Sequence, residues 1–271
     1  MMSFQDFLPS DTPKYRYKSY DECLQLFEEK YDELKCEEDP LGQAYNPYFI
    51  MDVDECSFLD CFVYSGERLL TLSWEIYDHV SQSTLLRMES SQHAVAIGAF
   101  TTIFSAWART VPPEVENTST RTVRGATRTK RADISWAPKN MPRGLSHKWP
   151  TFVGEVAWSE PRSKLIADMK FWLNDPGSCV NAAITISVLR GRILIEKWET
   201  SGNQTPSPSQ ALEICRNPKH GFPQVSGNLS INFADVFLRN PDPEKGEEDF
   251  ILTETDMHEM ADQVWSFQYD S

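Results

Sequence analysis

Apolar side chains recur at helical spacing in two segments in the first half of the chain. In residues 20–34 they fall on one face, and in residues 85–109 large apolar residues recur among small ones at near-helical intervals. This period is that of an amphipathic α-helix. We therefore predict a helix in each segment. The second should end at Pro112-Pro113, because proline has no backbone N–H to donate.

In the second half of the chain the pattern changes to short apolar runs that are typical of strands. We predict strands over residues 132–136, 151–158, 182–189 and 192–198, a helix from Ser159-Glu160-Pro161 to Asn174, a further strand over 229–233 and a terminal helix over 257–265. Arg190-Gly191 supplies turn residues that would join two strands in a hairpin. This order of elements indicates an α/β fold, in which helices flank a sheet.

Charge divides the 271 residues into three regions. The formal net charge is −14, and the acidic residues crowd both ends of the chain while the middle is close to balanced. We expect an acidic accessory region over residues 1–84, a core over 85–240 and an acidic C-terminal segment over 241–271 that ends in a helix. The net charge argues against a protein whose whole surface binds a polyanion.

Six cysteines are scattered along the chain, and no two have the CxxC spacing of a zinc-binding pair. We interpret them as reduced thiols of a cytoplasmic or nuclear protein. The first residues show no charged start followed by an apolar run, and no apolar run approaches the roughly 20 residues that span a bilayer. We therefore expect no signal peptide and no association with a membrane.

Two carboxylates lie within predicted apolar strands. Asp133 belongs to the strand 132–136, and Glu155 lies near the centre of 151–158, where side chains alternate between two faces. A charge in such a strand is costly to bury unless it is paired, protonated or bound to a metal. Two carboxylates on adjacent strands can meet at one point and hold Mg²⁺ or Mn²⁺. The alternative is that each acid is an edge or solvent-facing residue.

The helix after the second acid carries two lysines. On a wheel of about 100° per residue, its buried stripe includes Leu165, Met169 and Trp172. Lys170 lies on the flank of this stripe, where its stem can be buried and its ammonium group can reach the sheet. Lys164 lies nearly opposite and is expected to point to solvent. The alternative is that both lysines are solvated.

Basic residues cluster once in this acidic chain, directly before Asp133. The cluster consists of Arg121, Arg124, Arg128, Lys130 and Arg131. Arginine beside a metal site can hold phosphate groups, so these residues form a candidate nucleic-acid-binding strip. The alternative is a solvated loop.

The same residues resemble a known superfamily. The runs Lys130-Arg131-Ala132-Asp133-Ile134-Ser135-Trp136, Lys148-Trp149-Pro150 and Glu155-Val156-Ala157-Trp158-Ser159-Glu160 are similar to PD-(D/E)XK nucleases, and more closely to a set of uncharacterised fungal proteins and their bacterial Uma-type endonuclease relatives. The run Ile195-Glu196-Lys197-Trp198-Glu199 and the tail from Phe237 to Trp265 fit the same group. The resemblance covers roughly residues 85–265. It implies a restriction-endonuclease-like core, a central mixed sheet flanked by helices, with N- and C-terminal helical additions.

The resemblance also implies roles for individual residues. Asp133 matches the first motif aspartate and Glu155 matches the second acid. Together with the backbone carbonyl of Val156, they would hold the metal ion.

The lysine of the motif departs from the usual pattern. It normally stands two residues after the second acid, where this chain has Ala157. In the Uma-type relatives the lysine is relocated to the next helix, and Lys170 falls at the matching place. Lys164 is an auxiliary candidate. Glu89 is a candidate extra carboxylate from the first core helix, although it equally suits the start of that helix.

Two main hypotheses of function follow. The first is a Mg²⁺- or Mn²⁺-dependent phosphodiesterase that cuts nucleic acid, with DNA as the expected polymer. The metal would activate an attacking water, and Lys170 would orient that water or stabilise the developing charge. The second is a catalytically inactive relative that binds a protein or nucleic acid, which Ala157 and the net charge favour. A third is a different enzyme that uses the acid pair, such as a glycosidase.

Overall fold

The computed structural model describes residues 3–36, 46–111, 115–145, 147–158, 160–200, 205–217 and 223–269. The chain forms two compact units, each with a hydrophobic core of its own. The first unit comprises Met1–Glu89 and Thr122–Arg131, and the second comprises Ser90–Arg121 and Ala132–Ser271. The boundary near Glu89 lies close to the one expected after residue 84. However, the first unit also takes a hairpin from the middle of the chain, and the acidic C-terminal segment belongs to the second unit.

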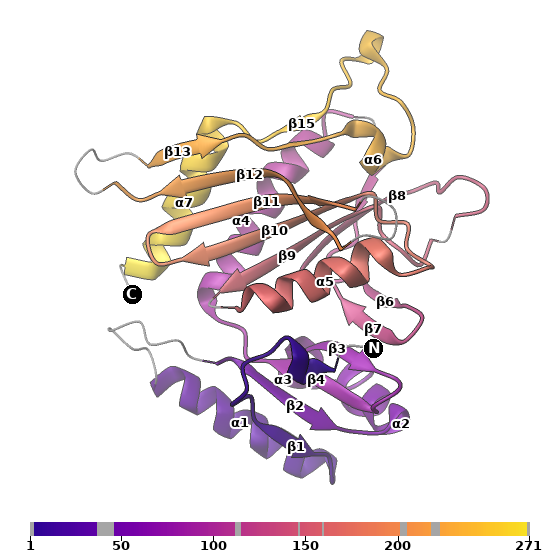
Figure 1. The fold of residues 1–271 in the computed structure, drawn as a ribbon, viewed down its shortest axis with the longest axis vertical. Coiled ribbons are helices and arrows are strands. Elements are labelled where there is room, and N and C mark those ends of the chain that lie inside the picture. Colours follow the sequence, from indigo (N-terminus) through magenta and orange to yellow (C-terminus); the bar gives the residue numbers. More distant parts are fainter. Residues whose placement is uncertain are drawn as a thin grey trace. The chain divides into compact units, whose positions relative to one another are not determined.

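The first unit is built on a six-stranded sheet (Figure 1). Its elements are η1 (Phe4–Asp6), β1 (Lys14–Arg16), α1 (Tyr20–Cys36), β2 (Tyr48–Asp52), α2 (Glu55–Phe58), the π-helical turn η2 (Leu59–Val63), α3 (Arg68–Ser73), β3 (Trp74–Asp78), β4 (Ser83–Arg87), β6 (Thr122–Arg124) and β7 (Arg128–Arg131). The strand order is β1-β2-β4-β3-β7-β6, with only β1 and β2 parallel. The expectation of a purely helical N-terminal addition is therefore wrong. The sequence did not indicate these strands, because they are too short to leave a clear period.

Aromatic side chains fill the core of this first unit. Phe27 on α1, the helix predicted over residues 20–34, packs edge-on against Phe49 of β2 with ring centroids 5.1 Å apart. Phe58 stacks on Tyr77 of β3 at 4.2 Å. Burial of these rings fixes α1 and the α2–η2 segment against the sheet.

The second unit contains the predicted α/β core (Figure 1). Its elements are α4 (Ser91–Ala108), β5 (Val115–Asn117), β8 (Ile134–Pro138), β9 (Phe152–Trp158), α5 (Arg162–Asn174), β10 (Ala182–Leu189), β11 (Arg192–Glu199), β12 (Ser207–Cys215), β13 (Gln224–Gly227), β14 (Ser230–Ile231), α6 (Phe233–Phe237), η3 (Pro243–Lys245), β15 (Phe250–Ile251) and α7 (Glu254–Tyr269). The main sheet has the order β13-β12-β11-β10-β9-β8-β5. β9 and β10 are parallel and the other neighbours are antiparallel, so the sheet is mixed.

This mixed sheet flanked by helices confirms the fold class and is consistent with a restriction-endonuclease-like core. The hairpin expected at Arg190-Gly191 is present, since Leu189 of β10 pairs with Arg192 of β11. Gly191 supplies the left-handed turn conformation with a φ of 68°. The terminal helix is longer than expected, whereas the strand expected over 229–233 shortens to β14 before α6 begins.

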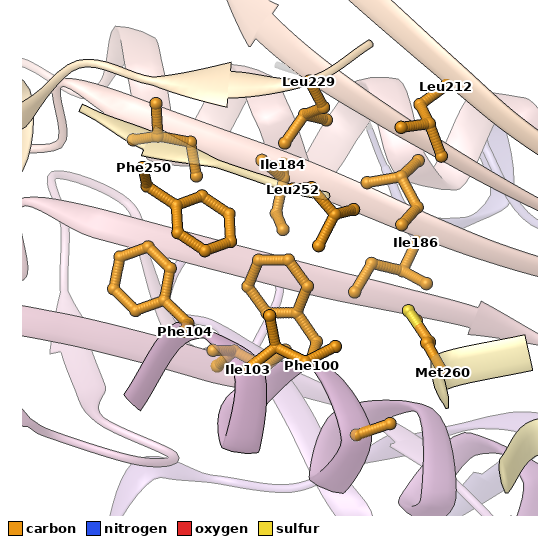
Figure 2. Packing of buried hydrophobic residues seen from close by; sticks show 14 of the residues in the cluster. Phe100, Ile103, Phe104, Ile184, Ile186, Leu212, Leu229, Phe250, Leu252 and Met260 are labelled. Carbon is orange, nitrogen blue, oxygen red and sulfur yellow. The ribbon is translucent and has the colours of Figure 1, made fainter. Parts of the chain in front are cut away.

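The two faces of this sheet differ in chemistry. One face is apolar and is covered by α4 and α7; Figure 2 shows Phe100 and Phe104 of α4 beside Ile184, Ile186 and Met260. The ring of Phe104 stacks on Phe152 of β9 with centroids 4.6 Å apart. α5 lies on the opposite face, where β9 presents Glu155. The alternation predicted for residues 151–158 is therefore confirmed.

The helix predicted over residues 85–109 is wrong in its first turns. Residues up to Arg87 form β4, and α4 begins at Ser91 after an N-cap in which the Ser90 hydroxyl accepts from the backbone N–H of His93. A capping serine ends the extended chain because its side chain satisfies an amide that has no partner within the helix. Glu89 consequently lies before the helix and is exposed.

The start of α5 also differs from the prediction. Its N-cap is Pro161, without a side-chain hydrogen bond, while Ser159 lies outside the described residues.

Buried apolar residues of the described elements form these two cores. Within the described ranges, no helix has both the length and the apolar character needed to cross a bilayer.

Candidate active site

Strand register places three acids and a hydroxyl at one level of the second sheet. The antiparallel pairing of β8 with β9 puts Asp133, one residue before β8, level with Glu155. β10 places Thr185 beside Glu155, and β11 places Glu196 beside Thr185. Paired residues point to the same face. Glu155, Thr185 and Glu196 therefore form a polar row on the α5 side of the sheet.

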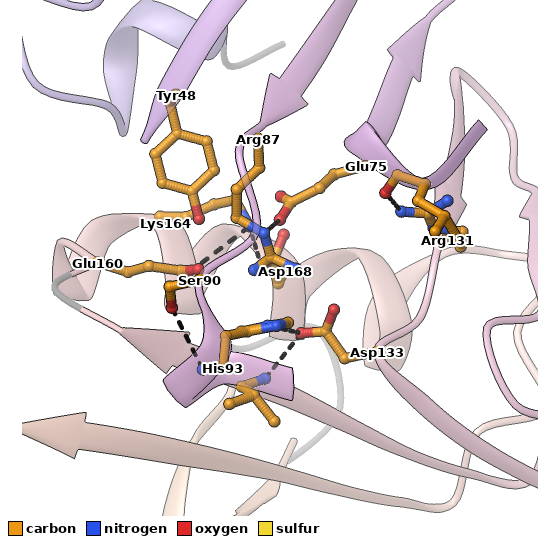
Figure 3. Close-up of polar contacts among 12 residues, drawn as sticks. Tyr48, Glu75, Arg87, Ser90, His93, Arg131, Asp133, Glu160, Lys164 and Asp168 are labelled. Atoms are coloured by element: carbon orange, nitrogen blue, oxygen red, sulfur yellow. Dashed lines mark hydrogen bonds and ion pairs between the residues drawn. The ribbon is translucent and has the colours of Figure 1, made fainter. Parts of the chain in front are cut away.

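Asp133 is held by two donors. Its Oδ2 accepts the backbone N–H of Val156 at 2.8 Å and lies 3.2 Å from Nε2 of His93 (Figure 3). The Asp133 side chain is 12% exposed, whereas that of His93 is 3% exposed. The predicted acid thus lies at a partly accessible point between the sheet and the start of α4.

Sequence reasoning missed His93. A signal was present, because His93 lies three residues before Ala96 and seven before Phe100, on the buried face of α4. A polar side chain on an apolar helical face requires a partner in the core. That partner is Asp133.

Glu155 is 3% exposed and projects from the centre of the sheet. Its Oε1 accepts the indole N–H of Trp172, on α5, at 2.5 Å. The alternative that this acid faces solvent at an edge is therefore excluded. A buried carboxylate needs such donors, and Trp172 provides one because indole N–H can only donate.

The prediction that Lys164 of α5 points to solvent is wrong. Lys164 is 1% exposed, with its Nζ 2.7 Å from Oδ2 of Asp168 and 3.9 Å from Oε2 of Glu160 (Figure 3). Lys170 is half-buried. A wheel centred on apolar residues alone failed because the buried face of α5 also contains the ion pair between Lys164 and Asp168, one turn apart.

Arginine completes the polar row at its far end. Both guanidinium NH groups of Arg162 donate to the carboxylate of Glu196, and Oε2 of Glu196 also accepts from Thr185 at 3.4 Å. The same guanidinium lies 4.7 Å from the ring centroid of Trp198. The fork geometry and the ring contact explain why arginine, rather than lysine, suits this position.

The basic strip is bound to the protein at each described member. In the first unit, Arg124 pairs with Glu55 at 2.5 Å and Arg128 pairs with Asp78 at 2.9 Å. Lys130 is fully buried, and Arg131 donates to the carbonyls of Thr71 and Leu72 and lies over the Trp74 ring. In the second unit, Arg121 donates to the carbonyl of His147 at 2.9 Å. Arg124 is the strip residue classed as exposed. Nucleic-acid binding by these residues stays a prediction.

The donor set suits a hard divalent ion of limited coordination. Asp133 and Glu155 are carboxylates on adjacent strands, and Mg²⁺ is commonly bound through one or two carboxylates, with water and substrate phosphate completing the shell. In the part of the chain that the structure describes, no three His, Cys, Asp or Glu side chains group closely enough to hold a metal. Water and a substrate phosphate would have to complete the shell of any divalent ion held by Asp133 and Glu155.

Comparison with known proteins adds little to this geometry. No family model matches the chain, and no curated protein is similar to it in sequence. A solved structure from Anabaena variabilis, described as "a putative nuclease belonging to DUF820", matches with 9% sequence identity and a TM-score of 0.36. The match covers 49% of this chain and 74% of that protein. Any assignment of function therefore rests on the residues of the site itself.

Proposed function

We propose that the second unit is a Mg²⁺- or Mn²⁺-dependent phosphodiesterase that acts on nucleic acid, with DNA as the expected polymer and with Asp133 and Glu155 as metal ligands. The observation that supports this most is the sheet register that sets a partly exposed Asp133 level with a buried Glu155. The backbone carbonyl of Val156, the residue that holds Asp133 through its N–H, is the proposed third ligand. A bound divalent ion would polarise the phosphate and lower the pKa of an attacking water.

The protein side chains orient these ligands. His93 and the N–H of Val156 both contact Oδ2 of Asp133 and orient this carboxylate. The indole N–H of Trp172 in the same way orients the carboxylate of Glu155. Hydrogen bonds of this kind hold ligands in the geometry that the metal requires.

The catalytic cation has two candidates on α5. Lys170 is two residues from Trp172, so it projects about 160° away from the side chain that contacts Glu155. Lys164 projects about 80° away and lies on the buried face, paired with Asp168. We therefore favour Lys164 for stabilising developing charge. Measurement of cleavage by Lys164→Ala and Lys170→Ala tests this choice against the lysine that the family resemblance implies, Lys170.

The second candidate function is a catalytically inactive binding module. The observation in its favour is that Glu155 and Lys164 already have partners within the protein, as do the described arginines of the basic strip. The presence of Ala157 in place of the motif lysine also favours a binding module.

Calorimetric titration with Mn²⁺ tests the metal site. Wild type and the exposed control Glu244→Gln should bind the ion, while Asp133→Ala and Glu155→Gln should not. Cleavage of supercoiled DNA, single-stranded DNA and RNA is then followed with Mg²⁺, Mn²⁺ or EDTA. Equal binding by wild type and Asp133→Ala, or none by either, would contradict the proposal. Metal binding without cleavage of any polymer would favour the binding module.

A further inference from the structure

Three sulfur atoms meet in the core of the first unit. Cys61 Sγ donates to Cys23 Sγ at 3.9 Å, and Cys23 Sγ donates in turn to Met51 Sδ at 4.0 Å. Cys23 comes from α1, Met51 from β2 and Cys61 from η2, so the tertiary fold alone assembles them. All three side chains are almost completely buried.

The backbone at Cys61 is unusual. η2 is a π-helical turn from Leu59 to Val63, with Cys61 at its centre. Such turns are rare and occur frequently at functional sites. Tyr17 is half-buried and packs against the same core.

We propose that Cys23, Cys61 and Met51 form a binding site for a soft monovalent metal ion, Cu(I). Two thiolates and a thioether are soft ligands of the kind that select Cu(I). With metal–sulfur bonds of about 2.3 Å, as for a zinc thiolate, a trigonal arrangement places its sulfurs about 4.0 Å apart. The observed separations, 3.9 Å between Cys61 and Cys23 and 4.0 Å between Cys23 and Met51, match two edges of this triangle.

Charge and protons balance in a simple exchange. The two thiol protons leave to solvent as the ion binds, because thiolate is the ligand form of cysteine. The ion replaces the two S–H···S contacts that link the sulfurs in its absence. The surrounding aromatic core excludes water from the site, and an apolar shell of this kind favours the reduced ion.

A surface cleft borders the core that contains the three sulfur atoms. A cleft of about 420 Å³ in the first unit is lined by residues that include Arg16, Tyr17, Asp52 and Asp54. Tyr17 therefore faces the cleft and also packs against the core that contains the sulfurs. An ion would reach the core from this cleft by movement of the Tyr17 ring, with Asp54 as a carboxylate at the cleft.

Anaerobic titration of the full chain with Cu(I), buffered by bicinchoninate, tests the proposal. A variant that keeps only Cys23 and Cys61, with Cys36, Cys56, Cys179 and Cys215 changed to serine, should retain one bound equivalent and release two protons. Cys61→Ser and Cys23→Ser should lose the bound ion at chelator concentrations that leave wild type loaded. Met51→Leu should lose part of the affinity. The exposed Cys56→Ser is the matched control.

Circular dichroism identifies any cysteine variant that fails to fold. X-ray absorption on the loaded wild type keeps the test decisive in that case, because it should show sulfur scatterers at about 2.3 Å and no nitrogen or oxygen shell. Full binding by folded Cys61→Ser, absence of binding to wild type, or a spectrum without sulfur ligands would overturn the proposal.

Discussion

The indole N–H of Trp172 donates to Oε1 of Glu155 at 2.5 Å, and both side chains are buried. This hydrogen bond joins α5 to the central strand β9. It stabilises a carboxylate that would otherwise be costly to remove from water.

Trp172→Phe should test both roles of this bond. Loss of a hydrogen bond to a charged group should lower the free energy of unfolding by about 1.5–3 kcal/mol. If Glu155 is a metal ligand, the affinity for Mn²⁺ should fall by about 10- to 100-fold. Urea unfolding and calorimetry measure the two effects. Glu155→Gln and the double mutant complete the cycle, and a coupling energy below about 0.5 kcal/mol would show that the bond contributes little.

Lys164 and Lys170 should differ sharply in their effect on stability. Lys164→Met leaves Asp168 charged and buried, which should cost about 3–5 kcal/mol of unfolding free energy. Lys170→Met changes a half-buried side chain and should cost no more than about 0.5 kcal/mol. The double mutant Lys164→Met/Asp168→Leu should recover most of the loss. Equal losses from both single lysine variants would contradict the orientation of α5 in which Lys164 is buried and Lys170 is half-buried.

Arg124 is the member of the basic strip best placed to exchange partners. Its side chain is 63% exposed in its pair with Glu55, so Arg124→Ala should change stability by less than about 1 kcal/mol. If the strip contacts DNA, this variant should flatten the slope of log affinity against log salt by about 0.9. Arg128→Ala breaks a pair whose side chains are 13% and 5% exposed, and should destabilise the fold instead. A DNA affinity with an unchanged slope in Arg124→Ala would remove this residue from the binding surface.

Two glycines should respond in opposite ways to alanine. Gly98 is exposed within α4, and a Cβ added there would have open space around it, so Gly98→Ala should stabilise the protein by about 0.5–1 kcal/mol. Gly227 has a φ of +84°, and an added Cβ would lie 2.2 Å from the carbonyl oxygen of Ala211. Gly227→Ala should therefore disrupt the pairing of β12 with β13. Thermal unfolding measures both, and a neutral Gly227→Ala would contradict the described register.

Acid stability should depend in part on Glu247. The Arg239 guanidinium, which donates to both of its oxygens, lowers the pKa of Glu247 from 4.5 to about 2. Because the folded pKa lies below the unfolded one, the stabilisation is complete above about pH 4.5 and is lost as the pH falls towards about 2. Wild type should therefore be more stable than Glu247→Gln at pH 7, and the difference in Tm should shrink between these two values. A constant difference in Tm down to pH 2 would show that the lowered pKa of Glu247 does not contribute to acid stability.

The sequence by itself determined the elements whose period repeats over many residues. The strand 151–158, the hairpin 182–198 and the helix 20–34 were all predictable, because each buries one face and its apolar spacing records that face. The same alternation assigned Glu155 to the face opposite Phe152. The short strands of the first unit were not predictable, since strands of three to five residues contain too few alternations to give a signal.

Only the tertiary structure decided which polar groups meet. Glu155 and Trp172 are separated by 17 residues, His93 and Asp133 by 40, and Cys23 and Cys61 by 38. Such pairs arise from strand register and from the packing of helices on the sheet, and neither leaves a local pattern. The orientation of Lys164 shows the same limit. A wheel built from apolar residues places a lysine outside, but a carboxylate one turn away, such as Asp168, makes its burial favourable once the helix docks.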